Sequence, residues 1–87
     1  MSRRKIHMPT VLKFGPYRFY FYSHEPNEPP HIHVDREEAS AKFWLKEVSL
    51  AHNVGFRQKE LNTLQTLIKQ HQKIFLEKWY GYFGTKN

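Results

Sequence analysis

The sequence predicts a single α+β domain, in which an antiparallel sheet of about four strands carries one long C-terminal helix packed on one face. Two patterns indicate this fold. Between Thr10 and Leu45, short runs rich in β-branched and aromatic residues alternate with turn-forming segments. After Phe56, apolar residues recur every three or four positions, which is the period of a helix. A length of 87 residues fits one domain of this kind.

Composition indicates where the domain begins and ends and which kinds of chemistry it can support. Residues 1–7 are predicted to form a disordered basic arm, residues 8–84 the domain and residues 85–87 a tail. Half of the formal net charge of +6 belongs to the arm, so the domain is only mildly basic. The chain has no cysteine, which excludes disulfides and cysteine-based zinc sites. Without a membrane span or a signal segment, we expect a cytoplasmic protein with no membrane association and no cofactor.

The first predicted hairpin joins strands at residues 10–14 and 17–23 across Gly15 and Pro16. Proline is a poor second central residue of a tight turn, so the connection is expected to be slightly wider than two residues.

The next two strands are predicted at residues 31–36 and 41–45. Glu37 and Glu38 lack the glycine or asparagine that a two-residue mirror-image turn favours, so we expect a four-residue loop over residues 37–40. This loop sets the pairing of the two strands, which would place Asp35 opposite Lys42, His33 opposite Trp44, and His31 opposite Lys46.

The C-terminal part of the chain is predicted to be helical. Residues 48–56 fit either a fifth strand or a short helical turn, and the sequence leaves both open. The helix is expected from about Gln58 to Tyr82, although Arg57 offers no acceptor as an N-cap while Glu60 stands in the position of a capping-box acid. Its apolar face consists of Leu61, Leu64, Ile68, His71, Phe75, Trp79 and Phe83.

Alternation along the strands assigns the two faces of the sheet. Apolar residues such as Phe19, Ile32, Val34 and Phe43 would face the helix. The opposite face, termed the outer face, would carry Arg18, Tyr20, Tyr22, His31, His33, Asp35, Lys42, Trp44 and Lys46.

The segment HEPNEPPHIHV, residues 24–34, is the strongest functional signal in the chain. Its three prolines stiffen a loop that leads into a strand, and the strand would project His31 and His33 from the same face. Histidine titrates near neutral pH, so the pair could act as acid and base in a metal-independent ribonuclease. Glu28 would orient one imidazole, and Lys46 or Arg18 would contact phosphate.

Three other functions fit the same residues. RNA could bind without cleavage, with Tyr20, Tyr22 and Trp44 stacking on bases and Arg18, Lys42 and Lys46 meeting phosphates. The aromatic face could instead dock a partner protein or a second copy. A weak divalent-metal site could form from His31 and His33 with His24, Glu25 or Glu28.

The chain also resembles a known family. MPTVLKFGPYRFYFYSHEPNEPPHIHV, followed by AKFWL, GF and a helix with a tryptophan near its end, is similar over residues 8–83 to small, mainly bacterial proteins grouped as domain of unknown function 4160. NEPPHIHV is the distinctive part of this resemblance. The site residues that the resemblance implies are limited to Glu28, His31 and His33, which lie within it. Related sequences tend to have glycines at the positions of Glu37 and Glu38, and a serine at that of Arg57.

This resemblance implies a protein encoded beside another small protein, in an arrangement suggestive of toxin–antitoxin modules, and it brings no established activity. The leading expectation is therefore a toxin–antitoxin-like component that binds RNA, with cleavage by His31 and His33 as its catalytic version and the adjacent small protein as a partner.

Overall fold

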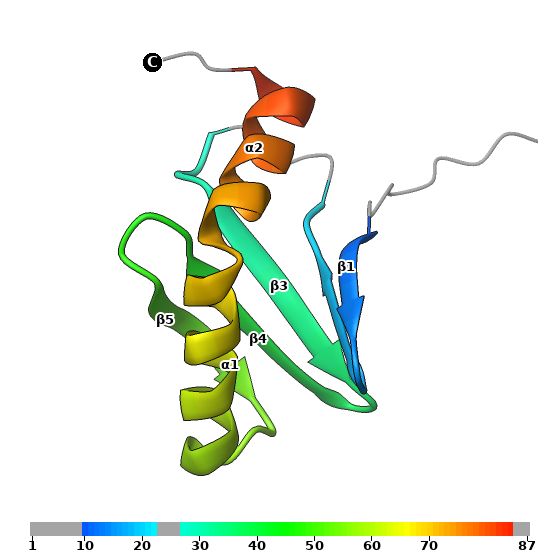
Figure 1. Cartoon of the computed structure of the whole chain (residues 1–87). Helices are drawn as coiled ribbons and strands as arrows, with labels where there is room; N and C mark the ends of the chain where they lie inside the picture. The colour runs from blue at the N-terminus through cyan, green and yellow to red at the C-terminus, as the bar shows by residue number, and fades with distance from the viewer. Residues whose placement is uncertain (1–9, 23–26, 85–87) are drawn as a thin grey trace, which may run out of the picture.

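The protein folds into one antiparallel sheet with two helices across one face, as a computed structural model of residues 10–22 and 27–84 shows (Figure 1). The α+β class is thus confirmed. The strands follow one another in the sheet in chain order, β1 to β5. The elements are β1 Thr10–Phe14, β2 Tyr17–Tyr20, β3 His31–Arg36, β4 Ala39–Trp44, β5 Ser49–Val54, α1 Gln58–Gln70 and α2 Gln72–Phe83. The arm and the tail expected at residues 1–7 and 85–87 lie outside the described residues.

The segment that the sequence left open forms a fifth strand. β5 pairs antiparallel with β4 and lies at the edge of the sheet. Its register shifts by one residue between the pairs Lys42–His52 and Phe43–Leu50, so Ala51 forms a bulge on the β5 side.

The first hairpin is tighter than expected. Phe14 pairs directly with Tyr17, so the turn consists of Gly15 and Pro16 alone, and the wider connection is wrong. Gly15 has a φ of 58°. A positive φ at the first central residue, followed by the negative φ that a proline ring imposes, is the combination of a type II′ turn.

The second hairpin also has a two-residue turn, which overturns the predicted pairing. Arg36 pairs with Ala39, and Glu37 takes the left-handed conformation, with a φ of 54°, that glycine or asparagine would adopt more easily. The turn therefore forms at the expense of backbone strain at a glutamate. As a result the observed cross-strand pairs are His31–Trp44, His33–Lys42 and Asp35–Ser40.

The long helix predicted after Phe56 is divided at His71 into α1 and α2. At the break, the backbone N–H of His71 is shared between the carbonyls of Leu67 and Ile68, both 3.1 Å away. The His71 ring nitrogen Nδ1 lies 2.9 Å from the Leu67 carbonyl. The predicted apolar face is otherwise confirmed, since its buried residues are Leu61, Leu64, Ile68, Phe75 and Trp79.

The core lies between this helical face and the inner face of the sheet. The aromatic and aliphatic residues Phe19, Ile32, Val34 and Phe43 are completely or almost completely buried there. Two glutamines attach the helices to the connection between β4 and β5, because Gln65 donates to the carbonyl of Val48 and Gln72 to that of Leu45. In the described ranges, neither helix is long and apolar enough to cross a membrane.

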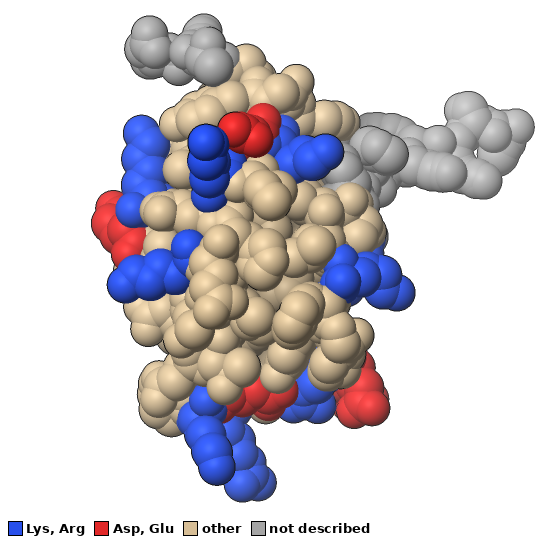
Figure 2. Space-filling model, in the orientation of Figure 1, with Lys and Arg blue, Asp and Glu red and all other residues tan. Residues whose placement is uncertain are grey.

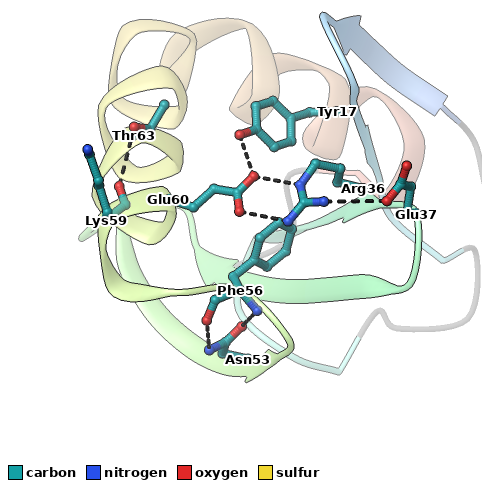
Figure 3. Close-up of polar contacts among 8 residues, drawn as sticks. All are labelled: Tyr17, Arg36, Glu37, Asn53, Phe56, Lys59, Glu60 and Thr63. Carbon is teal, nitrogen blue, oxygen red and sulfur yellow. Dashed lines mark hydrogen bonds and ion pairs between the residues drawn. The ribbon is translucent and has the colours of Figure 1, made fainter.

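Glu60 joins three segments that are distant in sequence (Figure 3). Its carboxylate accepts a hydrogen bond from the Tyr17 hydroxyl at 2.7 Å and two from Arg36, at 2.6 and 2.8 Å. These contacts replace a capping box, and Arg57 makes no capping side-chain hydrogen bond in the described chain. The hydrogen bonds from Arg36, followed by that from Tyr17, hold the pKa of Glu60 below its ordinary value. The Glu60 carboxylate thereby connects the start of β2, the end of β3 and the first turn of α1.

Candidate functional site

The outer face brings the predicted site residues together in rows that cross the strands. One row runs through Tyr20, His33, Lys42 and His52, which are successive cross-strand partners on β2, β3, β4 and β5. A second row contains Arg18, Asp35 and Ser40. Lys46 lies beyond β4 in an exposed turn, outside the strand pairing.

Tyr20 is the buried centre of this face and not an exposed stacking surface as expected. Its residue is 4% exposed, and its hydroxyl donates to Asp35 at 3.0 Å. The Arg18 guanidinium lies 4.5 Å from the centre of its ring. Burial, together with hydrogen bonding to Tyr22 and Asp35, raises the pKa of the Tyr20 phenol. Tyr20 therefore holds the face together.

His33 lies beside Tyr20 and is half-buried. Its imidazole stacks on the Tyr20 ring, with centroids 5.3 Å apart and planes 19° apart, and meets the Tyr22 ring edge-on at 4.7 Å. These two contacts fix the ring while part of it remains accessible. His33 on β3 and Tyr22, which follows β2, are thus partly accessible rings of the outer face.

His31 is completely buried, so the expectation that both strand imidazoles face water is wrong for this one. Its Nδ1 lies 2.9 Å from the carbonyl oxygen of Pro29, an arrangement in which a protonated Nδ1 donates. The rings of Trp44 and Trp79 pack against it, with centroids 5.8 and 4.9 Å away. The two-residue hairpin places Trp44 opposite His31, and α2 brings Trp79 to it, which together explain the burial.

Lys42 lies on β4 between its partners His33 and His52, and it forms an ion pair within the outer face. Its ammonium group donates to the Glu28 carboxylate at 2.6 Å and lies 4.8 Å from the centre of the Trp44 ring. The same Glu28 oxygen is 3.6 Å from Nδ1 of His31. Glu28 therefore bridges Lys42 and the edge of the buried histidine, where the sequence predicted that it would orient an imidazole.

His52 is a member of the outer face that the sequence analysis did not find. It is exposed on β5 next to Lys42, so that Lys42 is flanked by His33 on one side and His52 on the other. Recognising residues 49–54 as a strand would not have been enough, because alternation groups His52 with the apolar Leu50, and it is the bulge at Ala51 that puts the two on different faces.

A metal site does not emerge from the described ranges, 10–22 and 27–84, in which no group of three histidine and acidic side chains could hold an ion. His24 and Glu25, two of the ligands considered from the sequence, lie outside those ranges.

The helix side of the molecule offers a different surface. Its Lys and Arg side chains are spread around the face and do not gather in one patch (Figure 2). An open recess of about 550 Å³ lies between the first two strands and α2, lined by Thr10, Val11, Phe21, Glu77, Lys78, Gly81 and Tyr82. The predicted histidines and cations of the outer face do not line this recess.

The fold and the site define a class of small α+β protein, in which helices cover one face of a meander sheet and a rigid aromatic and histidine-bearing surface occupies the other. The chain belongs to the family described as Domain of unknown function (DUF4160), which matches its residues 17–80. This span runs from the start of β2 into α2 and includes Glu28, His31 and His33. Comparisons with curated proteins and with solved structures found no match.

Proposed function

We propose that this protein binds single-stranded RNA through its outer face. The observation that carries the proposal is a set of partly exposed rings, Tyr22, His33 and Trp44, held beside Lys42 on one sheet surface. Rings fixed in this way can stack on unpaired bases, and neighbouring cations can contact the phosphates between them.

Three cations lie on the outer face or next to it. Arg18 is on β2, Lys42 is on β4, and Lys46 is exposed in the turn that follows. The formal net charge of +6 adds a general attraction to a polyanion. Stacking requires unpaired bases, so a single strand fits this surface better than a duplex does.

Cleavage by a His31 and His33 pair is not part of this proposal. An imidazole with an exposed fraction of 0% cannot reach a substrate unless the surrounding rings move, and His31 is in that position. Its contacts with Pro29 and Trp79 support a structural role.

The family resemblance extends the proposal to a biological setting. We expect the protein to act in the bacterial cytoplasm as a component of a toxin–antitoxin-like pair, with the adjacent small protein as its partner. Support for this part comes from the resemblance alone.

The decisive experiment is fluorescence anisotropy with a labelled 12-nucleotide RNA. Trp44→Ala should weaken binding by roughly tenfold or more, because stacking of one base contributes about 1–3 kcal/mol. Tyr82→Ala is the matched control, since Tyr82 is an exposed ring on α2 at the other face. Absence of binding by the unchanged protein, or equal weakening by both variants, would contradict the proposal.

Docking of a protein partner on the same face is a second candidate, favoured by the ion pair of Lys42. Its charge is already compensated by Glu28, which leaves less of it for a phosphate, and aromatic rings are enriched in protein interfaces. If Trp44→Ala abolished binding of the adjacent gene product and left RNA binding unchanged, this second candidate would replace the first.

A further inference from the structure

We propose that two copies of this chain associate through β5, whose free edges pair as antiparallel strands to give one continuous sheet. This inference is independent of RNA binding, because it concerns the edge of the sheet and not its outer face.

In the part of the chain that the structure describes, β5 is a terminal strand of the sheet and pairs only with β4. The strand has the sequence SLAHNV, which contains no lysine, proline or acidic residue. Its apolar members Leu50 and Val54 are 44% and 53% exposed. Proteins usually protect an edge strand with charge or proline. The opposite edge, β1, carries Lys13, whereas β5 carries no such charge.

Charges on either side of β5 favour a second copy of this chain as the occupant. Glu47 precedes the strand and Arg57 follows it, and both are exposed. In an antiparallel pairing centred on His52, the end of β5 that follows Glu47 lies beside the end of the other copy's β5 that precedes Arg57, and symmetry repeats this arrangement at the other end. Lys46 beside Glu47 is also exposed, so the self-complementarity of this edge depends chiefly on β5 itself, whose residues carry no lysine, arginine or acid and can pair with a second copy without repulsion between like charges.

This pairing would join the outer faces. Antiparallel pairing of identical strands has its two-fold axis perpendicular to the sheet, so both outer faces point the same way. The row of Tyr20, His33, Lys42 and His52 would continue across the axis into the same residues of the second copy.

The association should be weak. The bulge at Ala51 bends the strand, and six residues span only about 20 Å, so the shared edge is short. A dissociation constant between roughly 10 μM and 1 mM fits a small interface of this kind.

Cysteine cross-linking tests the pairing directly, because the chain has no cysteine of its own. In His52→Cys, the two thiols would face each other across the axis, with Cα atoms about 5 Å apart, within reach of a disulfide. Ser49→Cys is the matched control on the same strand, since its Cα atoms would be about 20 Å apart. Mild oxidation should cross-link the first variant and leave the second monomeric.

Sedimentation equilibrium of the unmodified chain supplies the second measurement. The apparent mass should rise from monomer towards dimer with concentration. Val54→Lys should raise the dissociation constant of the dimer at least fivefold. Ile74→Lys, which adds the same charge at an exposed position of α2, should leave that constant unchanged. A monomer up to about 1 mM, or equal cross-linking of the two cysteine variants, would overturn the inference.

Discussion

Glu28 and Lys42 form an ion pair of 2.6 Å directly beside the Trp44 ring. A phosphate that bound next to a base stacked on Trp44 would have to share the ammonium group with this carboxylate. Glu28 therefore limits the affinity of the outer face for an anion.

Replacing Glu28 with glutamine should strengthen RNA binding by about three- to tenfold, because Lys42 then becomes fully available to phosphate. The slope of log affinity against log salt concentration should steepen by roughly one charge. Fluorescence anisotropy at several salt concentrations measures both quantities. Glu37→Gln, which changes the net charge equally at an exposed turn, should leave the slope unchanged. A parallel change in both variants would show that only net charge matters.

The two strand histidines should differ in what they contribute to stability. His31→Ala should lower the free energy of unfolding by about 2–4 kcal/mol, because it leaves a cavity among buried rings and removes a hydrogen bond to Pro29. His33→Ala, at a half-buried position, should cost about 1 kcal/mol or less. Urea denaturation measures both. Equal losses would show that His31 is not the structural member of the pair.

Glu60 should make stability depend on acidity. Its pKa in the folded protein is lowered from 4.5, so the stabilisation by its ionised form is complete above that value and is lost as the pH falls through the lowered pKa. The difference in thermal midpoint between the natural chain and Glu60→Gln should therefore shrink as the pH decreases from about 7 to about 2. Glu38→Gln, a change at an exposed turn, should show no such convergence.

The strained turn offers a stabilising substitution. Glu37→Gly should raise the free energy of unfolding by about 0.5–1 kcal/mol, because glycine adopts a φ of 54° without steric penalty. The neighbouring Glu38→Gly is the control and should lower it by a similar amount, since only the flexibility of the unfolded chain increases there. Urea denaturation of the two variants should give opposite signs. A loss in both would mean that the Glu37 side chain contributes more than its backbone costs.

Much of this fold could be predicted from the period of its apolar residues. Alternation placed Ile32 and Val34 in the core, and the helical period identified Leu64 and Ile68. The same alternation correctly assigned Lys42 to the outer face.

The predictions that were wrong relied on the conformational preferences of single residues, which the packing of the whole fold can override. Glu37 accepts a left-handed conformation that its side chain disfavours, and this shifts the pairing of β3 with β4 by two residues. The burial of His31 depends on that shift and on Trp79, which is far away in the sequence. Neither could be read from local patterns, so alternation assigned the strand positions of these residues correctly, while the accessibility expected for His31 was wrong.

The carboxylate that Tyr17 and Arg36 share couples events at distant points of the chain. Unwinding the first turn of α1 would leave the Arg36 guanidinium, at the end of β3, without its carboxylate partner. Opening the first hairpin would break the hydrogen bond that the Tyr17 hydroxyl donates to the same carboxylate. Amide protons in these three regions should accordingly exchange with solvent at similar rates, as parts of one cooperative unit.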